Sequence, residues 1–176
     1  RKYLSLDFED LIYFTLYILQ NFPDVKAKWQ RKMNYVLVDE VQDCNANDWE
    51  IYETLSALHG NLFLVGDPDQ TIYEWRGAHL EKFVNWQPTT DVIMAQNYRS
   101  TATILDAANS IIENNDLRIP KDLYTQNTVG CPITHFHGKD DRQEADWISK
   151  QINSMKEGGA EYSDFAVLVR SSYLTR

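Results

Sequence analysis

The chain has 176 residues, of which 43% are hydrophobic and 24% are charged, an ordinary composition for a globular protein. Its net charge of -9 excludes a nonspecific basic coat for nucleic acid, because such coats need clustered lysines and arginines, but it leaves room for a narrow single-strand groove with aromatic side chains. No apolar run approaches the roughly 20 residues of a membrane span, and Cys44 and Cys131 lack the spacing of a zinc site and fit a reducing compartment such as the cytoplasm.

Helices and strands are predicted to alternate along the chain. Helices are expected where apolar residues recur at helical spacing, and strands where short apolar runs end in acids, glycine or proline. The predicted helices cover residues 7–22, 25–32, 47–58, 80–86, 104–114 and 141–156. The predicted strands cover residues 35–38, 62–65, 92–95, 133–136 and 165–169, and residues 114–130 are expected to form an irregular connection. This alternation predicts an α/β fold with a parallel sheet.

An acidic motif, residues 38–43 (VDEVQD), follows the first predicted strand. Ligands of open α/β sheets bind outside the carboxyl ends of the strands. Two adjacent acids there can divide the chemistry, one holding a magnesium ion on nucleotide phosphates and the other deprotonating the attacking water. Acids are also common at solvated strand ends, so the pair alone fits both interpretations. Gln42 and Asp43 favour the chemical one.

A second motif, residues 66–78 (GDPDQTIYEWRGA), follows the next predicted strand. Gln70 could contact a terminal phosphate or its attacking water. Tyr73 and Trp75 lie in a polar loop bounded by glycines, where exposed aromatic rings can stack on nucleic-acid bases with about 1–3 kcal/mol per base. Packing of both rings beneath the loop is the alternative for isolated aromatic residues.

The third motif, residues 96–100 (QNYRS), lies between a predicted strand and a helix. Arg99 could supply positive charge to a transferring phosphoryl group, and Tyr98 could stack on a base. A single Tyr-Arg pair equally fits a surface cation–π or ion-pair contact.

Taken together, in this order and spacing, these stretches resemble motifs II, III and IV of the UvrD/Rep-type (PcrA-like) superfamily-one DNA helicases. The glutamine of the acidic motif separates the chain from the Asp-Glu-Ala-Asp group of RNA helicases. Residues 7–11 (DFEDL) and 169–172 (VRSS) also look like this family. The resemblance therefore covers nearly the whole chain.

The resemblance implies ATP and Mg²⁺ as cofactors and a role for each matched residue. Asp39 and Glu40 would bind the magnesium ion, and Glu40 would be the catalytic base. Gln70 would sense the terminal phosphate. Tyr98 would stack on the adenine, and Arg99 would reach the terminal phosphate from the second motor domain.

The same resemblance implies single-stranded DNA and duplex-junction DNA as partners, and no membrane. Tyr73 and Trp75 would contact the DNA strand, with Trp75 stacking on a base. Arg76 would pair with a nearby acid and couple the ATP site to the DNA groove. Arg170 and Ser171 would touch the DNA backbone.

The implied fold consists of parts of two RecA-like domains of the P-loop NTPase class, residues 1–92 and 93–176. Closing and opening of the cleft between them would drive 3′-to-5′ translocation along single-stranded DNA and duplex unwinding. The phosphate-binding pattern Gly-x-x-x-x-Gly-Lys-Ser/Thr, which precedes this region in the family, does not occur, and the chain begins with Arg1 without a signal peptide. We therefore expect an internal piece that by itself does not hydrolyse ATP at a helicase-like rate.

Two other functions fit parts of this pattern. The motor could belong to a helicase–nuclease subunit, in which a nuclease domain would lie beyond the C-terminus of this segment. Alternatively, the chain could be a degenerate module that only binds DNA or a protein. The presence of Asp39, Glu40, Gln70 and Arg99 argues against degeneration, because a binding module has no chemical need for all four.

Overall fold

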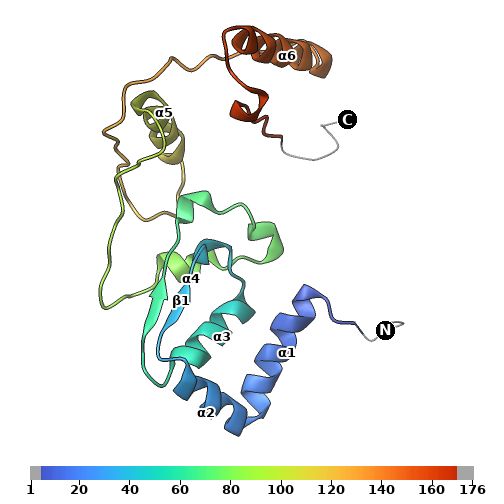
Figure 1. Cartoon of the computed structure of the whole chain (residues 1–176). Helices are drawn as coiled ribbons and strands as arrows, with labels where there is room; N and C mark the ends of the chain where they lie inside the picture. Colours follow the sequence, from blue (N-terminus) through green and yellow to red (C-terminus); the bar gives the residue numbers. More distant parts are fainter. Residues whose placement is uncertain (1–4, 170–176) are drawn as a thin grey trace. The chain divides into compact units, whose positions relative to one another are not determined.

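The computed structural model describes residues 5–169 (Figure 1). The chain divides into two compact units, Arg1–Gly130 and Cys131–Arg176. The predicted boundary after residue 92 concerns motor domains and stays a prediction.

The helices of the first unit begin and end close to the positions predicted from the sequence. They are α1 (Phe8–Asn21), α2 (Pro23–Lys32), α3 (Ala46–Ser56), α4 (Leu80–Val84) and α5 (Ala102–Ile112). Local capping explains several of these boundaries. Asp7 and Asn45 each form a capping box with the acid three residues later, and Pro23 occupies the first turn of α2, where its missing N–H costs nothing.

Strands β1 (Val36–Val38) and β2 (Leu62–Leu64) form a two-stranded parallel sheet, as the sequence predicts for these segments. Helix α3 packs against both strands, and α1 and α2 pack against α3, so these elements form successive layers (Figure 1). The core between sheet and α3 is built from Val38, Val41 and the fully buried Trp49. Since the two strands are parallel, their carboxyl ends meet at one edge, which places the first two motifs next to each other.

Three predicted strands, residues 92–95, 133–136 and 165–169, are wrong, because these segments form neither strand nor helix. Apolar sequence makes a segment suitable for a strand, but a ladder also needs a neighbouring backbone to pair with. Residues 92–94 are exposed, and the nearest pairing is an isolated parallel bridge between Gln96 and Tyr124. The irregular connection predicted for residues 114–130 is confirmed.

The second unit contains helix α6 (Asp141–Glu157), which confirms the predicted helix, and a short 3-10 helix at Tyr162–Asp164. The side chain of Asp140 caps α6 by accepting a hydrogen bond from the N–H of Gln143. The rings of Phe136 and Trp147 stack with centroids 4.7 Å apart. Within residues 5–169, the helices are too short or too polar to cross a bilayer.

Candidate functional site

The acidic motif lies where β1 ends. The backbone turns sharply at Glu40, which has φ 51° and ψ 41°, the left-handed conformation that is unfavourable for any residue with a side chain. Within residues 5–169 it is the one non-glycine residue with a positive φ. Asp39 supports the turn, since its Oδ1 accepts the N–H of Glu40 at 3.0 Å. Both carboxylates are exposed at the strand end, and strained residues of this kind concentrate at functional sites.

Gln42 connects the end of β1 to the end of β2. Its side-chain amide is almost fully buried, with 2% of the residue exposed. Nε2 donates a 2.6 Å hydrogen bond to Oε2 of Glu40, and Oε1 accepts the backbone N–H of Asp67 at 3.1 Å. The carboxylate of Glu40 is therefore held by a side chain that is itself fixed to the second motif.

Gly66 makes this bridge possible by leaving space beside β2. A Cβ atom at this position would lie 2.6 Å from Oε1 of Gln42 and 2.8 Å from Cγ1 of Val41. Both neighbours are buried, so neither can move into solvent. The glycine is required here for close approach.

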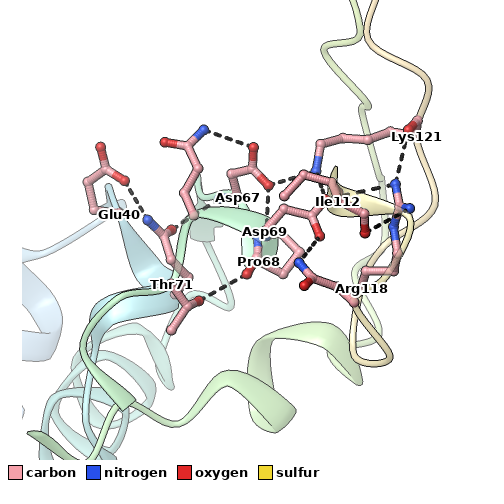
Figure 2. A network of polar contacts seen from close by, with 11 residues as sticks. Glu40, Asp67, Pro68, Asp69, Thr71, Ile112, Arg118 and Lys121 are labelled. Carbon is pink, nitrogen blue, oxygen red and sulfur yellow. Dashed lines mark hydrogen bonds and ion pairs between the residues drawn. The ribbon is translucent and has the colours of Figure 1, made fainter. Parts of the chain in front are cut away.

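The second motif begins with a 3-10 turn, Pro68–Gln70, that is capped by Asp67. Oδ1 of Asp67 accepts the N–H of Asp69 at 3.0 Å, and Oδ2 accepts Nε2 of Gln70 at 2.9 Å. The hydrogen bonds therefore run without a gap from Glu40 through Gln42 and Asp67 to Gln70. Figure 2 shows this network, with Glu40 at one end.

Two basic residues from the connection after α5 complete the network. Nζ of Lys121 lies 2.6 Å from Oδ1 of Asp67 and 2.7 Å from Oδ2 of Asp69. Figure 2 shows Lys121 reaching both acids. Nη2 of Arg118 lies 3.9 Å from the same oxygen of Asp69, and Nδ2 of Asn115 donates to Oδ1 of Asp69 at 3.2 Å. Two acids and two bases thus form a partly buried cluster with balanced formal charge.

The pKa values of Asp67 and Lys121 reflect this pairing. Burial alone would raise the pKa of Asp67, but hydrogen bonds from Lys121 and Gln70 outweigh it and hold that pKa below its usual value. Burial would lower the pKa of Lys121, but the hydrogen bonds to Asp67 and Asp69 raise it above its usual value. Both groups are therefore charged at neutral pH.

The aromatic loop of the second motif is open to solvent. The rings of Tyr73 and Trp75 have centroids 6.3 Å apart, and 79% of Trp75 is exposed. The guanidinium of Arg76 lies 5.4 Å from the ring of Tyr73 and 5.8 Å from that of Trp75. Packing of Trp75 beneath the loop is thereby excluded. Arg76 forms no ion pair with an acid within the described part of the chain, and its predicted coupling role stays a prediction.

The third motif presents an exposed Tyr98 ahead of α5. Its hydroxyl donates to Oε1 of Gln96 at 3.1 Å, and 76% of the residue is exposed. Oδ1 of Asn97 accepts the N–H groups of Arg99 and Ser100 at 2.9 and 2.7 Å, which fixes the turn into the helix. This turn leaves the side chain of Arg99 exposed.

The structure thus brings together some of the predicted site residues. Asp39, Glu40 and Gln70 belong to one hydrogen-bonded region, whereas the side chains of Tyr98 and Arg99 form no hydrogen bond to this network among residues 5–169. Arg170 and Ser171 lie outside the described residues. No group of three or more candidate metal ligands occurs in the described chain. Two exposed carboxylates still fit a nucleotide-bound Mg²⁺, because such ions use one or two protein carboxylates together with phosphate oxygens and water.

Sequence reasoning missed the bridging role of Gln42 and the whole basic half of the cluster. Lys121 and Arg118 lie in a stretch predicted as an irregular connection, where basic residues are ordinary. One signal was present: Asp67 and Asp69 stand two residues apart around a proline, and two acids so close need a cation when they are buried.

Comparison with known proteins gives a consistent assignment along the whole chain. Residues 1–91 match the family model described as UvrD/REP helicase N-terminal domain, and residues 92–176 match the UvrD-like helicase C-terminal domain. The chain is 42% identical over 177 residues to the ATP-dependent DNA helicase PcrA of Leuconostoc citreum. It is 38% identical to PcrA of Staphylococcus aureus and 36% identical to PcrA of Staphylococcus epidermidis, each over 176 residues. In each case 98% of this chain is covered but only 24% of the relative, so the chain spans about a quarter of the length of these helicases.

Proposed function

Because the chain belongs to the UvrD/REP helicase family, we propose that it is part of a motor that couples ATP hydrolysis to 3′-to-5′ movement on single-stranded DNA and to duplex unwinding. The observation that carries this proposal is the hydrogen-bond chain from Glu40 to Gln70. It links an exposed acid at one strand end to an exposed amide at the neighbouring strand end. A solvated surface has no need for a buried glutamine between them.

The residues of the first two motifs receive roles in hydrolysis. Asp39 and Glu40 would hold Mg²⁺, which supplies charge neutralisation on the nucleotide phosphates when it is bound. Glu40 accepts the proton of the attacking water, and Gln42 keeps its carboxylate in place by the bond to Oε2. Gln70 contacts the terminal phosphate or its water, and its amide is oriented by Asp67.

The aromatic loop is proposed as the DNA contact. Trp75 is exposed and close to both Tyr73 and Arg76, so it offers a flat surface for a base with a cation beside it. Stacking of this kind tolerates any sequence, because every base has an aromatic face. The loop follows Gln70 directly along the chain, which gives a short route from phosphate to DNA.

The remaining assignments concern a second motor domain. We propose RecA-like domains divided at residues 92/93, with Tyr98 stacking on adenine and Arg99 reaching the terminal phosphate from the second domain. The Asn97 turn supports this by leaving both side chains exposed. Arg170 and Ser171 are proposed DNA-backbone contacts. A DNA substrate favours the cytoplasmic location expected from the sequence.

The 176-residue chain alone is proposed to be inactive, because its sequence holds no phosphate-binding Gly-x-x-x-x-Gly-Lys-Ser/Thr loop. An ATPase assay of the purified chain with single-stranded DNA tests this. Strong DNA-stimulated turnover that Glu40→Gln abolishes would contradict it.

The proposed function is tested in the full-length protein that contains this segment. Glu40→Gln is expected to retain ATP binding and to lower DNA-stimulated turnover by about 10²- to 10⁴-fold, the usual contribution of a general base. Trp75→Ala is expected to lower affinity for single-stranded DNA by roughly 5- to 150-fold, which corresponds to about 1–3 kcal/mol of stacking.

Glu157→Gln is the matched control, because Glu157 is an exposed acid at the end of α6. It is expected to keep wild-type turnover. Near-wild-type activity in both Glu40→Gln and Trp75→Ala would overturn the proposed function. ATPase activity without any DNA stimulation in the wild type would do the same.

A further inference from the structure

We propose that Lys121 is a positioning residue of the motor: its ammonium group holds Asp67 and Asp69 together and thereby sets the orientation of Gln70 and of the Gln42 bridge to Glu40. This inference rests on the proposed function, because it concerns how those residues are aligned for hydrolysis.

Each carboxylate oxygen of Asp67 has its own hydrogen-bond partners. Oδ1 accepts Nζ of Lys121 at 2.6 Å and also the N–H of Asp69, while Oδ2 accepts the amide of Gln70 (Figure 2). Rotation of the carboxylate would exchange or break these bonds. The lysine therefore fixes the plane of the group that orients the proposed phosphate contact.

Electrostatic attraction also ties both acids to Lys121. Asp67 and Asp69 share a single ammonium group, and only 4% of the Asp69 side chain and 13% of the Lys121 side chain are exposed. Without the cation, two like charges would face each other with little solvent between them, which favours protonation or displacement of one acid. A change at Lys121 is thus transmitted to Asp67, although Lys121 itself forms no hydrogen bond with Gln70 or Glu40.

Arg118 cannot take over this role. It lies 3.9 Å from Asp69, and its Nη1 and Nη2 donate to the backbone carbonyls of Ile112 and Lys121. Those two bonds instead tie the lysine-bearing segment to the end of α5. Nδ2 of Asn109 on α5 also donates to the carbonyl of Leu123, at 2.9 Å. The position of the ammonium group is consequently coupled to the helix that follows the third motif.

A misplaced Gln70 or Glu40 is expected to slow the chemical step, because reacting groups displaced by about 1 Å can lose roughly 100-fold in rate. The proposed base and DNA contacts, Tyr98 and Trp75, share no hydrogen bond or ion pair with Lys121. The expected signature is therefore a loss of kcat with little change in the KM for ATP or in affinity for single-stranded DNA.

The test compares Lys121→Met with Lys121→Arg in the full-length protein. Lys121→Met keeps an unbranched side chain without the charge and is expected to lower DNA-stimulated kcat by about 10- to 100-fold, with KM and DNA affinity within about threefold. Lys121→Arg retains a cation that can donate hydrogen bonds to both carboxylates, and it is expected to recover most of the kcat lost in Lys121→Met. Lys150→Met, on the exposed face of α6, is the control and should match the wild type.

A double-mutant cycle makes the mechanism specific. If Lys121 acts through Asp67, the variant Lys121→Met/Asp67→Asn should be no slower than the slower of the two single variants. Fully multiplicative losses would overturn the proposal. So would wild-type kcat in Lys121→Met, or a joint loss of kcat, ATP binding and DNA binding that Lys121→Arg fails to restore.

Comparing Glu40→Gln with Lys121→Met distinguishes a failure of the proposed function from a failure of the proposed role of Lys121. Failure of Glu40→Gln to reduce turnover removes the function itself and this inference with it. Loss of turnover in Glu40→Gln together with wild-type kcat in Lys121→Met removes only the role of Lys121.

Discussion

Replacement of Gly66 by alanine tests the packing that joins the two strand ends. The added methyl group would lie 2.6 Å from Oε1 of Gln42 and 2.8 Å from Cγ1 of Val41, both far inside van der Waals contact. The same methyl group would lie 3.3 Å from Cε1 of Phe83. Since Gln42 and Val41 are almost fully buried, the strain must be relieved by shifting the strand ends or by breaking the glutamine bridge.

The expected cost follows from this geometry. Overpacking of a filled core by one methyl group costs about 1–3 kcal/mol, which raises the population of locally opened molecules by roughly 5- to 150-fold. Two amides report on this opening. The N–H of Val65 donates to the carbonyl of Val38 at 2.8 Å, and the N–H of Val41 donates to the carbonyl of Val65 at 3.1 Å.

Hydrogen–deuterium exchange in the full-length protein measures the effect. Peptides that contain Val41 and Val65 are expected to exchange about 5- to 150-fold faster in Gly66→Ala, and DNA-stimulated turnover is expected to fall as the Gln42 bridge is lost. Gly60→Ala is the control, because a Cβ there meets no atom within 4 Å although φ is 68°. The backbone strain of about 1–2 kcal/mol in Gly60→Ala should stay local to residue 60, so DNA-stimulated ATP turnover should be unchanged. Unchanged exchange and unchanged turnover in Gly66→Ala would show that the Gln42 bridge does not depend on the space beside Gly66.

Two further predictions concern the charged cluster and a helix cap. The ion pair between Asp67 and Lys121 stabilises the fold in the pH range where both groups are ionised. Because the pKa of Asp67 is lowered in the folded state, its contribution is present above about pH 4 and is lost as the pH falls through the folded-state pKa. Because the pKa of Lys121 is raised in the folded state, its contribution is present below about pH 10 and is lost as the pH rises through the folded-state pKa. Thermal melts of wild type and Lys121→Met should therefore differ most between these limits and converge outside them; a difference independent of pH would contradict this. Asn45→Ala should destabilise α3 by about 1 kcal/mol, because the side chain of Asn45 accepts the N–H groups of Asn47 and Asp48, and faster exchange at the start of α3 would reveal it; unchanged protection there would show that the cap contributes nothing.

The sequence predicts best those features that are fixed by near neighbours. The starts of α1 and α3 follow from Asp7 and Asn45, whose capping partners lie three residues away. The strands β1 and β2 are recognisable because each is a continuous apolar run, the pattern of a parallel strand, although Leu37 and Phe63 are exposed in the structure. Residues 92–95 have the same character, yet form no strand, since pairing depends on a backbone that no local pattern specifies.

The candidate site shows the same division. Asp39 and Glu40 are adjacent in sequence, so their shared location required no knowledge of the fold. The contact between Lys121 and Asp69 spans 52 positions and depends on how the chain returns after α5. A polar stretch with ordinary basic residues gives no indication of such a return. The network around Gln70 is therefore evident only in the folded structure.

The left-handed backbone at Glu40 has a consequence for protein engineering. Glycine would adopt this turn without steric penalty, whereas a residue with a Cβ atom loses about 1–2 kcal/mol there. Laboratory evolution toward heat resistance would thus tend to discard the proposed base, and evolution toward faster turnover would tend to restore it. At this one residue the demands of thermal robustness and of chemistry act in opposite directions.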